Sequence, residues 1–146
     1  MALAQGSCAI TTIGIEPTHA ETGFGYICVG AKIAGDAASS LAVHEVASFV
    51  EKPDRSTADR YLASGEYLWY SGMFFLTAGR MLEEARRHLP DLAQAMLAFV
   101  AAHDFDAAVH VLYPALPAIS IDSGIMKKAS GLRVVPGRFG WNDVGS

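Results

Sequence analysis

An acidic and a basic residue end an apolar stretch in Phe49-Val50-Glu51-Lys52-Pro53. Side chains at the carboxyl ends of strands in open α/β sheets line the binding crevice. Glu51 is therefore a candidate acceptor of hydrogen bonds from sugar hydroxyl groups, and Lys52 is a candidate partner of a phosphate. The alternative is a solvated strand end on which the two charges form a surface ion pair.

Two glycines flank an aromatic residue in the segment Thr22-Gly23-Phe24-Gly25-Tyr26-Ile27. Glycine lets a backbone approach a ligand closely and adopt a positive φ. Gly23 and Gly25 are therefore candidate ligand contacts, with an ordinary glycine-containing loop as the alternative.

Polar residues also interrupt the apolar run 67–76, at Trp69-Tyr70-Ser71-Gly72-Met73-Phe74. We expect this run to be a strand buried on both faces, where a polar group needs a partner. A hydroxylated ligand or the backbone can supply that partner. The glycine suggests a close approach by a ligand or by another backbone segment.

Two aspartates lie in further candidate motifs. Asp122 precedes an expected short helix over 123–129, which it could simply cap. Asp143, in Trp141-Asn142-Asp143-Val144-Gly145-Ser146, is a candidate ligand for Mg²⁺, which takes one or two carboxylates together with phosphate oxygens and waters. An Asx-type turn is the alternative for this motif.

Strand-like and helical patterns alternate along the chain, which predicts an α/β architecture. Strands are expected over 9–15, 26–33, 46–50, 67–76 and 132–136. Ser56 and Asp59 resemble a capping box, and Gly65 is placed to end that short helix. Apolar residues at helical spacing predict two more helices, with core faces formed by Met81, Leu82, Ala85 and Leu89 and then by Leu92, Ala93, Met96, Leu97 and Val100.

The composition narrows the class of protein. Of 146 residues, 51% are hydrophobic, which is enough apolar material for one globular unit. A formal charge of −4 argues against nucleic acid as a partner, because nonspecific binding to it needs clustered cations. No apolar run is long enough to cross a bilayer, and no basic leader is present. We expect a cytoplasmic protein without a membrane partner, in which Cys8 and Cys28 are buried free thiols.

The identities and order of these motifs, over about residues 11–146, resemble the sugar-1-phosphate nucleotidyltransferases, especially the mannose-1-phosphate guanylyltransferases. The resemblance implies an α/β fold with a Rossmann-like mixed sheet flanked by helices, and it makes residues 1–146 a partial domain. It also implies transfer of GMP from GTP to mannose 1-phosphate, with Mg²⁺ as cofactor.

The resemblance assigns roles to individual residues. Lys52 and Asp143 become catalytic, and Asp143 also becomes the metal ligand. The implied substrate-binding residues are Gly23, Gly25, Tyr26, Glu51, Lys52, Tyr70, Ser71, Gly72 and Asp122. The family usually has Asn at the position of Tyr70, so we expect altered sugar contacts there.

The family begins with a glycine-rich loop and a Pro-Lys element that hold the nucleotide, and neither is recognisable in residues 1–15. We therefore expect this chain to be the sugar-phosphate-binding part, inactive alone and able to use GTP only with that segment supplied. The alternatives are a glucose-1-phosphate nucleotidyltransferase fragment and a noncatalytic sugar-phosphate-binding or regulatory protein. A homo-oligomer is possible.

Overall fold

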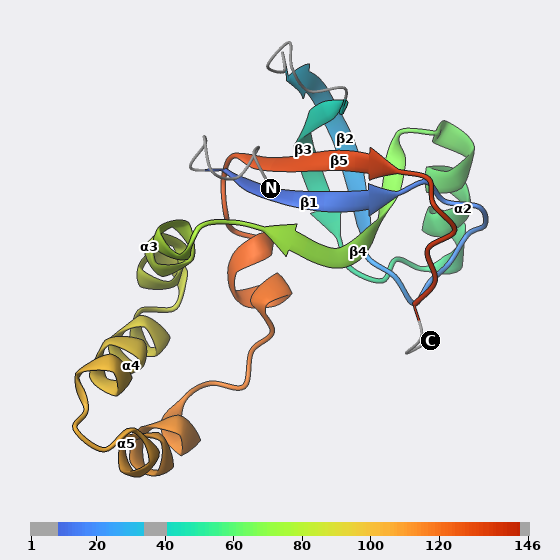
Figure 1. The fold of residues 1–146 in the computed structure, drawn as a ribbon. Helices are drawn as coiled ribbons and strands as arrows, with labels where there is room; N and C mark the ends of the chain where they lie inside the picture. Colours follow the sequence, from blue (N-terminus) through green and yellow to red (C-terminus); the bar gives the residue numbers. More distant parts are fainter. Residues whose placement is uncertain (1–8, 34–40, 144–146) are drawn as a thin grey trace. The chain divides into compact units, whose positions relative to one another are not determined.

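The computed structural model describes residues 9–33 and 41–143, which form two compact units (Figure 1). The first, here called the sheet unit, comprises residues up to Leu76 together with those from Gly131 onward. The second, the helical unit, is Thr77–Ser130.

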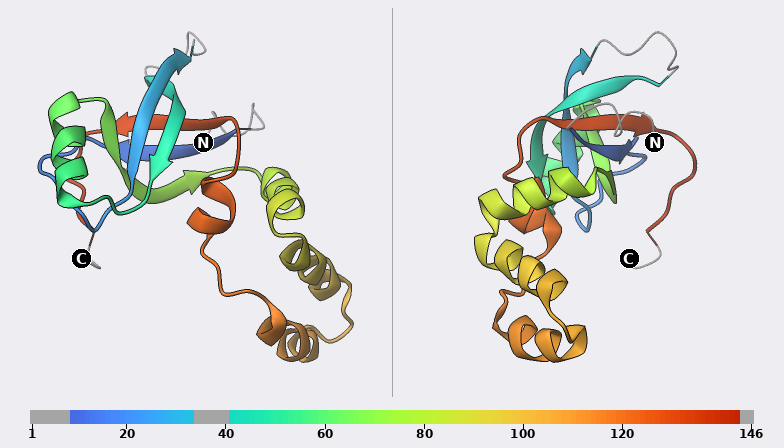
Figure 2. Two further views of the ribbon diagram at one scale, coloured as in Figure 1. Left: turned by 180° about the vertical axis from the view of Figure 1, so that it is seen from behind. Right: turned by 60° about the vertical axis from the view of Figure 1, so that its left-hand side comes forward.

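Five strands form the sheet unit. They are β1 (Ile10–Ile15), β2 (Tyr26–Ile33), β3 (Val43–Val50), β4 (Tyr67–Phe75) and β5 (Leu132–Gly137). The strand order is β1-β4-β2-β3-β5, and the sheet closes because β5 pairs with both β3 and β1. Figure 2 shows the β2–β3 hairpin from behind. The β1–β5 pair is parallel and the other pairs are antiparallel, so the predicted mixed sheet is confirmed. Its closure was not predicted.

Close packing inside the closed sheet requires a glycine in β1. A Cβ atom on Gly14 would lie 2.6 Å from Leu68 Cδ1 and 2.8 Å from Val134 Cγ2. Leu68 and Val134 belong to one buried apolar cluster with Ile27. The strands therefore approach one another more closely at this point than any larger residue would allow.

The sheet unit also contains the helix α2 (Arg55–Ser64). Gly65 ends it with φ 68°, as predicted, because glycine adopts this left-handed conformation without steric cost. The predicted N-terminal cap is wrong: Asp54, and not Ser56, caps the helix by accepting a hydrogen bond from the Thr57 N–H. The predicted strand over 46–50 begins three residues earlier, at Val43.

The helical unit contains α3 (Ala78–His88), α4 (Pro90–Ala101) and α5 (Phe105–Leu112), followed by a 3₁₀ turn (Tyr113–Ala115) and a π-helical turn (Asp122–Met126). The first two helices were predicted and the third was not. Part of the predicted core face of α4 is wrong, because Val100 is 87% exposed and Leu97 is 44% exposed. Among the described helices, none combines the length and the apolar character needed to cross a membrane.

Candidate functional site

Pairing of β2 with both β3 and β4 brings three of the predicted substrate-binding residues together. Tyr26 of β2 pairs with Val50 of β3, so the residues just outside this pair, Gly25 and Glu51, are also neighbours. On the other side of β2, the N–H of Tyr70 donates a hydrogen bond to the Gly25 carbonyl over 2.8 Å. Gly25, Glu51 and Tyr70 thus come from three separate parts of the sequence and meet at one place.

Gly25 leaves room for the Glu51 side chain. A Cβ atom at this position would lie 3.3 Å from Glu51 Oε2 and 3.0 Å from the Phe49 ring. Glu51 and Lys52 are exposed, and Lys52 has φ 43°, in the left-handed region that non-glycine residues rarely adopt. Within the described part of the chain, no hydrogen bond or ion pair engages either charged side chain, so the surface ion pair considered as the alternative does not form.

Tyr26 supports the glycine-containing loop from within. Its side chain is fully buried, and its hydroxyl donates to the Glu21 carbonyl (2.9 Å) and accepts from the Glu21 N–H (3.0 Å). The Glu21 carboxylate in turn accepts from the Gly23 N–H at 2.8 Å, and this bond is the main cause that lowers the pKa of Glu21. The Tyr26 side chain therefore positions the loop, and its hydroxyl is already engaged there.

Ser71 and Gly72 form an irregularity in β4. The pairing of β1 with β4 shifts register between Thr12 and Gly14, next to this pair. Ser71 Oγ donates to the Ile13 carbonyl over 2.6 Å, so the backbone is its partner. Gly72 has φ 72° and no atom within 4 Å of a Cβ placed on it, so a positive φ, and not a close neighbour, calls for glycine here.

The predicted burial of this strand on both faces is also wrong. Of its nine residues, only Leu68 and Trp69 are buried. The strand residues from Tyr70 on are half-buried or exposed, and their pairing with β1 is irregular.

Aromatic rings connect the turn that carries Asp143 to the glycine-containing loop. Asn142 and Asp143 are exposed, whereas Trp141 is half-buried. The ring centroid of Trp141 lies 5.3 Å from that of Phe24, which in turn lies 5.3 Å from Trp69. Phe24 was not among the predicted site residues, although its place between two glycines was a signal.

Asp122 lies in the helical unit, apart from the other predicted site residues in sequence and in unit. It does not cap a helix, since the Ser123 N–H donates to Ser120 Oγ. Its Oδ1 atom is buried and has no hydrogen-bond partner among the described residues. The helix predicted over 123–129 is instead a π-helical turn that spans Asp122–Met126.

The described residues contain no cluster of three or more His, Cys, Asp or Glu side chains suited to a metal ion. Asp143 thus contributes a single exposed carboxylate. Cys28 is a free, half-buried thiol, whereas Cys8 lies outside the described residues.

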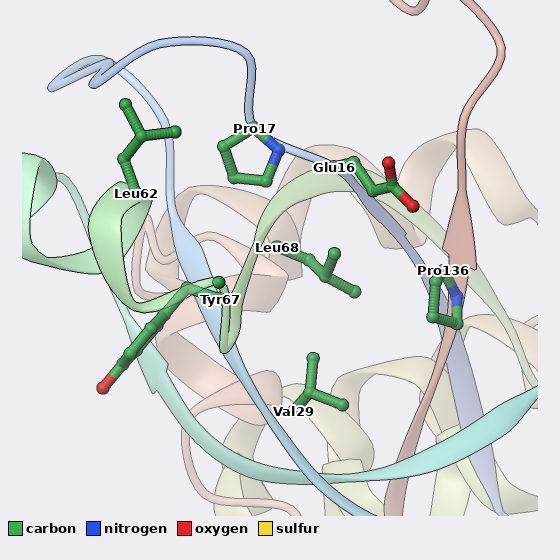
Figure 3. Close-up of a pocket in the computed structure, with 8 residues that line it drawn as sticks. Glu16, Pro17, Val29, Leu62, Tyr67, Leu68 and Pro136 are labelled. Carbon is green, nitrogen blue, oxygen red and sulfur yellow. The ribbon is translucent and has the colours of Figure 1, made fainter.

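A cavity of about 390 Å³ opens near the ends of β1 and β5 (Figure 3). Leu68 and Val29 point into it, and the ring of Tyr67 extends away from it. Burial is the main cause that raises the pKa of Tyr67 to about 12. None of the predicted substrate-binding residues lines this cavity; the lining residues are Glu16, Pro17, Val29, Leu62, Gly65, Tyr67, Leu68 and Pro136.

The sequence profile of the family described as "Nucleotidyl transferase" matches residues 2–146. The chain belongs to this family, and the resemblance inferred from its motifs is confirmed.

Individual relatives extend this result. The chain is 43% identical over 141 residues to the mannose-1-phosphate guanylyltransferase of Escherichia coli and 45% identical to the xanthan biosynthesis protein XanB of Xanthomonas campestris. Each alignment covers 94% of this chain but only 28–29% of the relative.

Solved structures agree with the fold. A Thermus thermophilus protein described as mannose-1-phosphate geranyltransferase superposes with a TM-score of 0.81 at 37% identity, over 99% of this chain and 39% of that one. A mannose-6-phosphate isomerase from Helicobacter pylori gives a TM-score of 0.70 at 25% identity, over 97% and 54% of the two chains.

Proposed function

We propose that this chain is the sugar-phosphate-binding part of a mannose-1-phosphate guanylyltransferase. In the whole enzyme, an oxygen of mannose 1-phosphate attacks the α-phosphorus of GTP. The bond between the α- and β-phosphates breaks, and the products are GDP-mannose and pyrophosphate. The names of several relatives support this substrate pair. The observation that carries the proposal is the contact of Gly25 with the Glu51 carboxylate, with Lys52 next in the sequence and both charged side chains exposed.

The attacking phosphate is already ionised, so the reaction needs positioning and charge neutralisation more than a strong base. The Glu51 carboxylate accepts hydrogen bonds from the sugar hydroxyls, beside a glycine that adds no side chain. The Lys52 ammonium pairs with the sugar phosphate. Ser71 and Gly72 border the sugar through the backbone, because the Ser71 hydroxyl is engaged by Ile13.

We propose Asp143 as the protein's ligand to Mg²⁺. A single exposed carboxylate fits a cation whose remaining ligands are phosphate oxygens and waters, and it does not fit a site built from protein groups alone. When bound, Mg²⁺ supplies positive charge to the reacting phosphates. We place the reaction in the cytoplasm, and the free thiol of Cys28 is in keeping with a reducing compartment.

Isothermal titration calorimetry of the chain with mannose 1-phosphate tests the sugar site, because it measures the affinity for this ligand. Lys52→Ala should weaken binding by about tenfold or more, because a hydrogen-bonded charge pair contributes about 1.5–3 kcal/mol. Glu51→Gln should weaken it as well. Lys32→Ala is the matched control, since Lys32 is an exposed lysine of β2 outside this site. Equal affinities for the chain and for the Lys52→Ala variant would overturn the proposal.

The same titration with glucose 1-phosphate separates the two sugars. Tighter binding of glucose 1-phosphate would replace the proposed substrate by the alternative one. Binding of inorganic phosphate with equal affinity would show that the sugar hydroxyls are not recognised, and the role of Glu51 would then be lost.

A further inference from the structure

Phe24 contacts both tryptophans of the protein. Its ring meets Trp69 at an interplanar angle of 79° and Trp141 at 71°, in each case with centroids 5.3 Å apart. Edge-to-face packing of this kind is the arrangement that the ring quadrupoles favour. A single side chain thus joins the glycine-containing loop, strand β4 and the turn that carries Asp143.

The Phe24 contacts add to the backbone hydrogen bonds that hold the loop and β4 in place. Trp69 is buried, and its Nε1 atom has no hydrogen-bond acceptor among the described residues, so ring contacts hold its orientation. One of these contacts is with His19, an exposed residue. Gly23 and Gly25, on either side of Phe24, have no side chains and are held through their backbone, by Glu21 and Tyr70 respectively. Phe24 therefore supplies the side-chain contact of this segment with the turn of Asp143.

We infer that Phe24 is a positioning residue that holds the turn of Asp143 against the Gly23–Gly25 loop, and this inference rests on the function proposed above. Gly25 lies beside Glu51 in the sugar site, and Asp143 is the proposed cation ligand. Phe24 touches neither ligand directly. It acts by keeping the cation ligand and the sugar loop in one fixed arrangement.

Because Phe24 holds the two sites in one arrangement, the binding of Mg²⁺ and the binding of mannose 1-phosphate become dependent on each other. If Mg²⁺ strengthens the binding of mannose 1-phosphate, then mannose 1-phosphate strengthens the binding of Mg²⁺ by the same factor. We expect a factor of about tenfold, which is within the usual range for coupled sites. Removing the Phe24 ring should bring the factor close to one while leaving each ligand able to bind alone.

Tryptophan fluorescence provides a direct measurement, because the sequence has only two tryptophans and both contact Phe24. The dissociation constant of mannose 1-phosphate is measured with and without Mg²⁺ in the original chain and in Phe24→Leu, which keeps an apolar side chain without a ring. Phe24→Tyr should restore the coupling. Phe139→Leu is the matched control, since Phe139 is 57% exposed and makes no ring contact with either tryptophan.

Loss of coupling in Phe24→Leu alone supports the inference, and an unchanged coupling factor overturns it. If the original chain does not bind mannose 1-phosphate at all, the proposed function is overturned instead. In that case acrylamide quenching without ligands decides the role of Phe24, in a Trp69→Phe background where only Trp141 emits. Faster quenching of Trp141 after Phe24→Leu supports the positioning role of Phe24, and equal quenching overturns it.

Discussion

The two units of this protein draw on contacts of very different range. In the sheet unit, β1 pairs with β5, so that Ile10 lies beside Leu132 from the other end of the described chain. In the helical unit, the ion pairs of the buried Glu84 in α3 lie one turn apart: Glu84 pairs with Arg80 at 2.7 Å and with His88 at 3.1 Å. Almost all of the predicted site belongs to the sheet unit, where distant segments must meet.

This difference shows how each unit responds to change. A contact one helical turn away forms whenever the helix forms, so its loss is felt locally. A strand pair between distant segments depends on the whole closed sheet. We expect substitutions in the sheet unit to disturb the candidate site and substitutions in the helical unit to leave it intact.

Glu84→Gln should have the largest effect. The Glu84 carboxylate is fully buried between Arg80 and His88, and removing one member of a buried ion pair costs about 3–5 kcal/mol. Urea unfolding followed by circular dichroism at the helix band measures the loss. Asp59→Asn is the control, because its pair with Arg55 is exposed and should contribute no more than about 1 kcal/mol. Similar losses in the two variants would contradict this prediction.

Gly14→Ala should destabilise the sheet unit by about 1–3 kcal/mol, because the added methyl overlaps Leu68 and Val134. Gly79→Ala, in α3, should instead stabilise the protein by about 0.5–1 kcal/mol. The added Cβ atom would lie 4.0 Å from its neighbour Thr77 Oγ1, and alanine favours the helix. Denaturant midpoints measure both changes. Effects of the same sign would remove the contrast between the two units.

Acid should weaken the glycine-containing loop by a smaller amount. The Gly23 N–H lowers the pKa of Glu21 in the folded chain from its ordinary 4.5. Stability from this bond is therefore complete above pH 4.5 and is lost as the pH falls through the lowered value. The melting temperature of Glu21→Gln should fall less between pH 7 and pH 3 than that of the original chain. Parallel curves would show that Glu21 is not linked to folding.

From the sequence, the residues that meet at the sugar site could be predicted only as members of separate motifs. Glu51 and Gly25 lie in different motifs, and no periodicity in either predicts that the carboxylate of one fills the space beside the other. The contact between Gly25 and Glu51 depends on the register of β2 with β3. A shift of one residue would move every side chain of the strand to the opposite face of the sheet.

Burial was the property that sequence patterns predicted least well. Glu84 is fully buried although it is charged, and Val100 is exposed although it continues an apolar stripe on α4. Helical spacing identifies which residues share a face, but only the neighbouring elements determine whether that face is covered.

Residue identity and local periodicity were enough to predict the family, the five strand cores and the helices α2, α3 and α4. The folded structure was needed to show that the sheet closes, that the Tyr26 hydroxyl bonds to Glu21 and that Phe24 joins Trp69 to Trp141. Sheet closure and the Phe24 contacts join separate segments, and the Tyr26 bond to Glu21 spans five residues of a loop that has no regular periodicity. Such contacts follow from strand register and packing in three dimensions, which no local pattern of residues specifies.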